Sequence, residues 1–228
     1  MNQLNSGRYG LPAVLVLLPL VLTAHGVSPG DQEVLNQGGL DAYVYVGAKH
    51  MVTGYDHLLF LAGVIFFLDG WRDIVKFITA FTIGHSITLT GATYLGITAD
   101  EHLVDAVIAL SVLYKGAENL DLFKQYLGVK TANLLLMVCV FGLIHGFGLS
   151  TRLQSFDLGE GSFLAKILCF NLGVELGQIA ALIPISLLIT QWRGHGSYTA
   201  FFKAVNWYLV LAGVVLFVWQ LAGYFGAA

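Results

Sequence analysis

Charged residues are scarce in this chain. Lysine, arginine, aspartate and glutamate make up only 11% of its 228 residues, whereas hydrophobic residues make up 57%. Soluble domains carry about 25% charged residues, so the composition excludes an ordinary soluble protein and favours a membrane protein. The formal net charge is only −3, and we therefore expect no nucleic-acid partner.

Sulfur-containing residues are also few. The two cysteines, Cys139 and Cys169, both lie in apolar runs, where we expect two buried thiols rather than a structural disulfide. Only three methionines are present, which argues against a Cu⁺ pathway because thiol and thioether ligands select Cu⁺. The chain also lacks a Gly-x-x-x-x-Gly-Lys-Ser/Thr stretch, so it does not hydrolyse nucleotides with a P-loop.

Long apolar runs dominate the sequence. Residues 1–24 contain an apolar run that is short for a span, and we expect a signal peptide or an N-terminal anchor there. Residues 25–228 are expected to form a single transmembrane domain, with residues 25–50 at the outer interface. Because lipid offers no partner to backbone groups outside a helix, we predict an all-α membrane bundle of about six spans. The predicted spans are 51–68, 74–96, 103–120, 132–149, 163–190 and 201–225.

Basic residues are distributed unequally between the loops. The loops near 69–76, 121–131 and 191–203 hold most of the lysine and arginine, whereas the opposite loops are mainly acidic, with Arg152 as the main exception. By the positive-inside rule the basic loops face the cytoplasm. We therefore expect a multi-pass protein of the bacterial inner (cytoplasmic) membrane with a periplasmic C-terminus.

Ionisable residues inside the apolar runs carry the functional prediction. Asp56 and His57 are adjacent in the first span, His85 falls near the middle of the second, and His145 lies in the fourth. An ionisable residue inside a transmembrane helix costs about 2.5–3.5 kcal/mol on insertion scales, so it normally marks a function. Imidazoles and carboxylates suit Ni²⁺, Co²⁺, Zn²⁺ or Fe²⁺, and a proton relay is the alternative. The metal ligands predicted in the outer half of the bilayer are Asp56, His57, His85, His145 and Glu175.

Other polar residues are expected near this site. Asn171, Glu175 and Gln178 follow i, i+4, i+7 spacing, so they share one helix face. In the third span Lys115 and Glu118 either neutralise each other or leave Glu118 as an exit ligand or gate toward the cytoplasm. Asp105 is expected at the solvated end of that helix, with a residue at the mouth of the ion path as the alternative, and the loop residues His102 and His195 are expected at the surface. The residues expected along the path of the ion, or supporting its ligands, are His50, Ser86, Glu118, Asn119, Asn171 and Gln178.

Five segments carry a resemblance to a known family: GYDHLLF, FTIGHSITL, ALSVLYKGAENL, FGLIHGFGL and FNLGVELGQ, in this order. Over residues 40–225 the chain resembles the HupE/UreJ family of hydrogenase and urease accessory membrane proteins. The resemblance implies a nickel permease or a nickel-delivery protein that serves nickel enzymes. It also implies functional roles for Asp56, His57, His85, Glu118, Asn119, His145, Asn171, Glu175 and Gln178.

His50 belongs to a second, shorter similarity. The stretch from His50 to His57 is similar to the nickel/cobalt permease signature His-x4-Asp-His, but it is one residue longer. On a continuous helix His50 lies on the face of His57 but about two turns outward. We therefore expect His50 to be an outer-side ligand or an interface residue, and not to share one ion with His57.

Three functions remain open from the sequence. We favour a permease or delivery protein for a divalent transition metal, with Ni²⁺ as its substrate and lipid around it, and we do not expect an enzyme. The second is an intramembrane Zn²⁺-dependent hydrolase, in which the histidines and Ser86 would activate a water. The chain has no His-x-x-x-His pair on one helix, and its predicted spans contain no Gly-x-Ser-x-Gly for that chemistry. The third is a non-transporting accessory subunit of a larger complex, and the sequence indicates neither protein partners nor a homo-oligomer.

Overall fold

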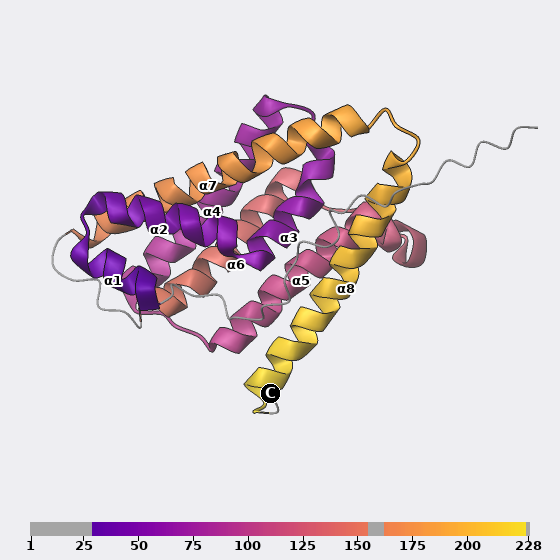
Figure 1. Ribbon diagram of the computed structural model, residues 1–228. Helices are drawn as coiled ribbons and strands as arrows, with labels where there is room; N and C mark the ends of the chain where they lie inside the picture. Colours follow the sequence, from indigo (N-terminus) through magenta and orange to yellow (C-terminus); the bar gives the residue numbers. More distant parts are fainter. Residues whose placement is uncertain (1–28, 155–161, 227–228) are drawn as a thin grey trace, which may run out of the picture.

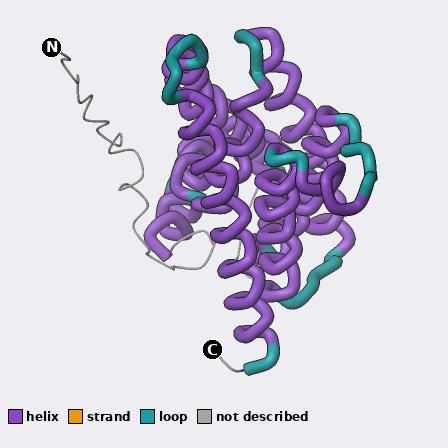
Figure 2. The backbone as a smooth tube through the Cα atoms, turned by 90° about the vertical axis from the view of Figure 1, so that its right-hand side faces the viewer, coloured by secondary structure: helices purple, strands orange, loops and turns teal. Residues whose placement is uncertain are grey.

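The computed structural model describes residues 29–154 and 162–226, which contain helices and loops without a β-strand (Figure 2). The predicted signal peptide or anchor at 1–24 lies outside the described residues. The helices are α1 (Pro29–Gln37), α2 (Leu40–Thr53), α3 (Tyr55–Val64), the 3₁₀ turn η2 (Ile65–Phe67), α4 (Trp71–Leu95), α5 (Glu101–Asn119), the π-helical turn η3 (Phe123–Leu127), α6 (Leu134–Leu153), α7 (Phe163–Trp192) and α8 (Tyr198–Tyr224).

Local capping signals set several helix boundaries. The carboxylate of Asp100 accepts a hydrogen bond from the backbone N–H of Leu103 at 3.2 Å and begins α5. The side chain of Asn133 accepts from two backbone N–H groups of the first turn of α6, at 3.0 and 3.2 Å. Such caps satisfy donors that have no partner inside the helix. Helix α4 ends at Gly96, which adopts the left-handed conformation with φ 66°.

Three helix pairs build the bundle: α4 with α6, α5 with α8, and α2 with α7. Figure 1 shows α2 beside α7 and α5 beside α8. A Cβ atom on Gly146 would collide with the carbonyl oxygen of His85, and one on Gly173 with that of Val44. The paired helices therefore touch through their backbones, as small residues allow in membrane bundles. This contact places the turn that holds His85 directly against the turn that holds His145.

Among the described residues, four helices are long and apolar enough to cross a membrane: α4, α6, α7 and α8. The bent pair α2–α3 makes a fifth if it is one span. Helix α5 carries four charged residues and is not among them, although it packs along α8 inside the bundle. The protein is therefore an all-helical bundle with four to five candidate spans, and the predicted span at 103–120, which corresponds to α5, stays a prediction.

The first predicted span differs from the structure. Instead of one helix over 51–68, helices α2 and α3 meet at Gly54 with an angle of 67° between them. Gly54 has an extended conformation (φ −70°, ψ 105°) and caps both helices, because its N–H donates to His50 O and its carbonyl accepts from Leu58 N–H. The expectation of an outer interface for residues 25–50 stays a prediction, and it covers most of helix α2. Its residues Tyr43, Val46 and Met51 are buried, and it packs along α7.

Polar contacts between loops define the two ends of the bundle. At the α7–α8 loop end, Arg193 pairs with Asp69 and donates to the carbonyl oxygens of Phe66 and Leu68, at 2.8 and 3.0 Å. At the α4–α5 loop end, Gln154 donates to Ile97 O at 3.0 Å. The loops before α4 and before α8 therefore lie at the same end of the bundle. This agrees with the sequence analysis, which placed both of these basic loops on one side of the membrane. Which end faces the cytoplasm stays a prediction.

Candidate metal centre

Three of the predicted ligands meet in the bundle. Asp56, His57 and His145, here called the metal cluster, each offer one ligand atom, and these atoms lie within 4.8 Å of one another. In the described parts of the chain this is the one group of three or more His, Cys, Asp or Glu residues with that geometry. Asp56 and His57 come from the first turn of α3, and His145 comes from the middle of α6. All three residues are at most 3% exposed.

The Asp56 carboxylate fixes the orientation of His57. Its Oδ1 atom accepts from the backbone N–H of His57 at 2.5 Å and lies 2.7 Å from His57 Nδ1. An ionised carboxylate only accepts hydrogen bonds, so Nδ1 carries the hydrogen and Nε2 keeps its lone pair. Carboxylate–histidine pairs of this kind orient the imidazole at many metal sites. His57 is therefore prepared to bind a metal ion through Nε2.

Ser111, on α5, contacts the ring of His145. Its hydroxyl donates to the carbonyl oxygen of Ile108 at 2.6 Å, and its Oγ lies 3.4 Å from His145 Nε2. Because the single hydroxyl hydrogen is already used, Ser111 can only accept from His145, which favours a hydrogen on Nε2 and a lone pair on Nδ1. Ser111 carried no predicted role, because its partner lies on another helix and no local pattern links the two.

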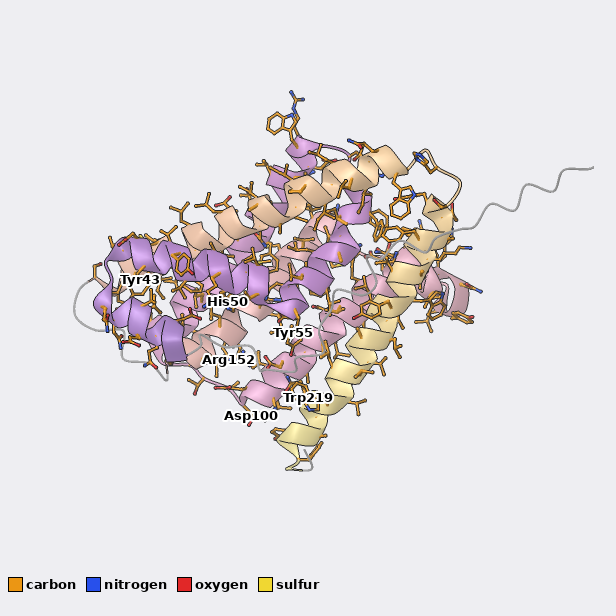
Figure 3. All side chains as sticks on the ribbon, viewed as in Figure 1. Tyr43, His50, Tyr55, Asp100, Arg152 and Trp219 are labelled. Atoms are coloured by element: carbon orange, nitrogen blue, oxygen red, sulfur yellow. The ribbon has the colours of Figure 1, made fainter. Side chains whose placement is uncertain are left out.

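His50 lies closer to the cluster than predicted. Its ring centroid is 5.0 Å from that of His57, which in turn is 4.7 Å from that of His145. A straight helix would separate His50 from His57 by about 10 Å along its axis, and that expectation is wrong because the chain bends at Gly54. Figure 3 shows His50 near the end of α2 and Tyr55 at the start of α3. The bend therefore produces a row of three imidazoles.

His85 lies beside this row but outside the cluster of three. It is fully buried, and its ring stacks on Phe81, which also contacts the ring of His145 edge-on. His85 Nδ1 is 2.9 Å from Asn171 Oδ1. Since an amide oxygen accepts, Nδ1 carries the hydrogen and Nε2 keeps the lone pair. Nε2 has no hydrogen-bond partner among the described residues, so His85 can offer a further nitrogen ligand.

The family model described as HupE / UreJ protein matches residues 31–227. The chain belongs to the HupE/UreJ family. The comparisons with curated proteins and with solved structures returned no match. The resemblance predicted from the five segments is thereby confirmed over nearly the whole chain.

The HupE/UreJ segments supply the metal cluster. GYDHLLF contributes Asp56 and His57, and FGLIHGFGL contributes His145. Family membership and the apolar helices indicate a multi-pass membrane protein, and the buried His/Asp group gives it a candidate site for a transition metal.

The predicted polar face of α7 in this HupE/UreJ protein is only partly directed at α4. Asn171 contacts His85, and Gln178 Oε1 accepts from Thr82 at 3.3 Å. Glu175 is half-buried and lies outside the metal cluster. Ser86 is also half-buried and, one position after His85, lies about 100° around the helix from it.

A separate polar cluster lies nearer the α7–α8 loop end. Lys115 Nζ is 2.7 Å from Glu118 Oε2, so the predicted neutralisation of these two charges is confirmed. Asn119 Nδ2 donates to Gly63 O at 2.8 Å and to Asn206 Oδ1 at 2.6 Å, which joins α5 to α3 and α8. We call Lys115, Glu118, Asn119 and Asn206 the Lys115 cluster. The role of Glu118 as an exit ligand stays a prediction.

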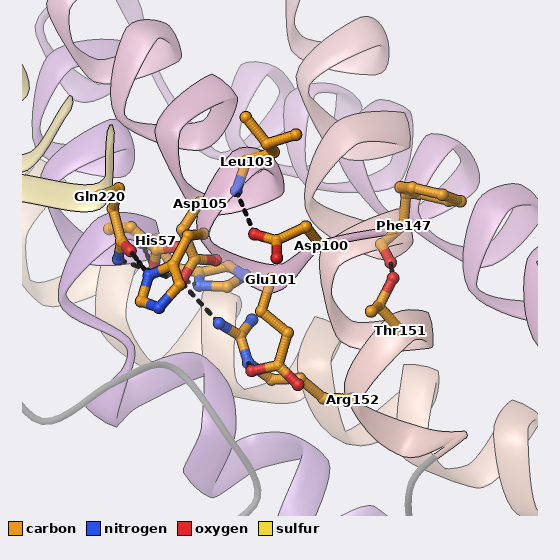
Figure 4. A network of polar contacts seen from close by, with 11 residues as sticks. His57, Asp100, Glu101, Leu103, Asp105, Phe147, Thr151, Arg152 and Gln220 are labelled. Carbon is orange, nitrogen blue, oxygen red and sulfur yellow. Dashed lines mark hydrogen bonds and ion pairs between the residues drawn. The ribbon is translucent and has the colours of Figure 1, made fainter. Parts of the chain in front are cut away.

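Asp105 is buried, so the expectation of a solvated helix end is wrong. Its Oδ2 accepts from Arg152 Nη2 at 2.5 Å and from Gln220 Nε2 at 3.2 Å (Figure 4). Gln220 Oε1 in turn accepts from Nδ1 of the exposed His102 at 2.8 Å. The partners of Asp105 come from α6 and α8, and helix packing alone brings them together.

Proposed function

We propose that this HupE/UreJ protein is a membrane permease or delivery protein for a divalent transition metal, with Ni²⁺ as its favoured substrate. The observation that carries the proposal is the metal cluster: two imidazoles and a carboxylate from α3 and α6, buried and within 4.8 Å. Two nitrogen ligands and one carboxylate suit Ni²⁺, Co²⁺, Zn²⁺ or Fe²⁺. A buried carboxylate also balances part of the charge of the ion, which lowers the cost of moving it out of water.

The row of imidazoles supports transfer of the ion from one ligand to the next rather than its permanent binding. The ring of His50 on one side and His85 on the other offer additional nitrogen atoms next to the metal cluster. An ion that exchanges between neighbouring ligands is held strongly enough to enter and weakly enough to leave. We propose that it enters from the α4–α5 loop end, taken as the periplasmic side, and leaves toward the α7–α8 loop end.

The break between α2 and α3 places backbone carbonyl groups near the path of the ion. Helix α2 ends at Thr53 beside His50, so its last carbonyl groups lie at the negative end of a helix close to the cluster. Interrupted helices at substrate sites are common in transporters, where carbonyl groups at such ends coordinate cations. The break at Gly54 therefore supports transport of a cation.

We propose transport rather than hydrolysis because the space beside the metal cluster is small. The cavity next to Asp56 has a volume of about 10 Å³, which is room for about one water and not for an organic substrate. The candidate nucleophile Ser86 is half-buried and does not belong to the metal cluster.

The test is metal binding by the purified full-length protein. After loading with Ni²⁺, the metal content is measured by mass spectrometry for the wild type and for the His57→Ala/His145→Ala double variant. We expect a stoichiometric ion that is lost in the double variant while its helix content and elution volume stay unchanged. His195→Ala is the matched control, because His195 is exposed in the α7–α8 loop.

Equal metal content in the wild type and the double variant would overturn the proposal. Uptake of Ni²⁺ into proteoliposomes that contain a nickel-sensitive dye then separates transport from simple binding. Binding without uptake would favour delivery to a partner.

A further inference from the structure

An arginine stands close to the metal cluster on the side of the α4–α5 loop end. Arg152 is in the last turn of α6 and is 7% exposed, and it pairs with the equally buried Asp105. Its Nε atom is also 3.5 Å from Glu101, whose side chain is half exposed. A buried arginine in an apolar bundle is costly, so it requires such partners. Figure 4 shows that the guanidinium lies between the α5 carboxylates, in a network that also contains Gln220 and His57.

The position of Arg152 relates it to the path of the ion. Arg152 and His145 are seven residues apart on α6, so they share a helix face about two turns apart. Arg152 is the one nearer the α4–α5 loop end. An ion that approaches His145 along this face from that end has to pass the Arg152 guanidinium and the carboxylates that hold it. If the Arg152–Asp105 ion pair only joined α5 to α6, it would not need to lie on the path of the ion.

A small cavity connects the Arg152 pair to the metal cluster. Its polar lining consists of Tyr55, Asp56, Asp105 and Gln220, and its volume is about 10 Å³, close to the size of one water. Asp105, which Arg152 holds, and Asp56, which orients His57, thus line the same space. The ion pair and the metal cluster are therefore neighbours that share one cavity.

We propose that Arg152 is a tethered cation that controls access of the substrate ion to the metal cluster from the α4–α5 loop end. The guanidinium neutralises Asp105 while no ion is present, and an incoming divalent ion replaces it there. A divalent ion brings twice the charge of the guanidinium, so the exchange favours it, whereas a monovalent ion brings no more charge than the tether. The proposal rests on the proposed function and adds a residue that selects ions by charge.

The experiment measures how fast an ion reaches the cluster. Co²⁺ is mixed rapidly with the detergent-purified full-length protein, and its visible absorption reports binding by imidazole nitrogen. We expect Arg152→Gln to raise the association rate constant about tenfold, the lower end of the effect that charge has on approach rates. Arg152→Lys, which keeps the charge, is expected to stay near the wild-type rate. K⁺ is then added as a competitor of Co²⁺. If K⁺ slows Co²⁺ association in Arg152→Gln but not in the wild type or in Arg152→Lys, this supports selection of the ion by its charge.

Arg193→Gln is the matched control. Arg193 is a partly buried arginine paired with an aspartate at the opposite end of the bundle, and its removal is expected to leave the association rate unchanged. If Arg152→Gln does not fold, because Asp105 loses its partner, the Asp105→Asn/Arg152→Gln double variant removes both charges. We expect this neutral pair to associate no faster than the wild type, because the carboxylate that would receive the ion is lost together with the guanidinium; faster association would show that Asp105 does not receive the ion.

The outcomes separate this proposal from the proposed function. If the His57→Ala/His145→Ala variant loses Co²⁺ while folded Arg152→Gln associates at the wild-type rate, the metal site stands and the role of Arg152 is overturned. An equal rise in Arg152→Lys would also overturn it, because the charge would then be irrelevant. If the wild type binds no Co²⁺ or Ni²⁺, both proposals fall.

Discussion

The Lys115 cluster and the metal cluster are both buried in apolar surroundings, but they differ in how their polar groups are paired. In the Lys115 cluster an ammonium meets a carboxylate at 2.7 Å, and an amide nitrogen donates twice. In the metal cluster imidazole nitrogens gather next to a carboxylate, without a lysine or arginine among them. Opposite charges that pair within the protein hold helices together, whereas collected lone pairs suit a cation from outside. The difference therefore indicates a structural role for the Lys115 cluster and supports the proposed binding role of the metal cluster.

The largest effect should follow from removing one charge of the Lys115 cluster. Lys115→Met leaves the Glu118 carboxylate buried without its ammonium partner, which we expect to destabilise the fold by about 3–5 kcal/mol. The Lys115→Met/Glu118→Gln double variant should recover most of this loss. Stability is measured by unfolding in mixed detergent micelles, and Ni²⁺ binding by the double variant should equal that of the wild type. Lost Ni²⁺ binding in a stable double variant would make the Lys115 cluster functional and remove the contrast.

A smaller effect is expected from the helix contact that positions the metal cluster. In Gly146→Ala the added methyl meets the backbone of His85, and we expect a loss of about 1–3 kcal/mol, typical of overpacking. Ni²⁺ affinity should fall as well, because His145 moves away from α4. Gly91→Ala on α4 is the control, since nothing lies within 4 Å of the added atom. Equal stability of the two variants would show that α4 and α6 do not need backbone contact.

Next in size is the loss of the carboxylate that orients His57. Asp56→Asn keeps the shape but removes the charge, and we expect Ni²⁺ affinity to fall about 10–100-fold, as for other groups that orient a histidine ligand. The stability of the fold should change little. Competition with a Ni²⁺ chelator measures the affinity, and the same substitution at the exposed Asp41 of α2 is the control. Wild-type affinity in Asp56→Asn would mean that His57 does not depend on this carboxylate.

The smallest effect is expected at Ser111. Ser111→Ala removes an acceptor at 3.4 Å from His145 Nε2, a long contact, and neutral hydrogen bonds contribute only about 0.5–1.5 kcal/mol. We therefore expect a change in Ni²⁺ affinity of a few-fold at most, with recovery in Ser111→Thr, which keeps the hydroxyl. A loss as large as that of Asp56→Asn would promote Ser111 to a main determinant of the site.

Much of the bundle could be predicted from the sequence because hydropathy is a local property. The apolar runs correctly indicated helices α4, α6, α7 and α8, and adjacency in the chain marked Asp56 and His57 as a pair. The bend at Gly54 could not be predicted in this way, because glycine is common in membrane helices and only packing decides where the chain breaks. The proximity of His50 to His57 depends on that bend.

The partners of Asp105 and His145 illustrate the other limit. Arg152, Gln220 and Ser111 lie on helices other than those of their partners, so no periodicity within one helix relates them. Arg152 was noticed only as an exception to the distribution of loop charges. Its burial became evident when α5 and α6 were placed side by side. Interhelical contacts of this kind follow from the assembled bundle and not from any single segment.

The backbone contacts of the glycines have a consequence for how the protein can evolve. At Gly146 and Gly173 the obstacle to a larger side chain is a peptide carbonyl of the neighbouring helix, and that group is the same whatever residue stands there. No change in a neighbouring side chain can therefore make room. Related sequences should keep glycine at these positions outright instead of exchanging it together with a second residue. A single mutation can therefore disrupt these helix contacts, and a second mutation in a neighbouring side chain cannot restore them.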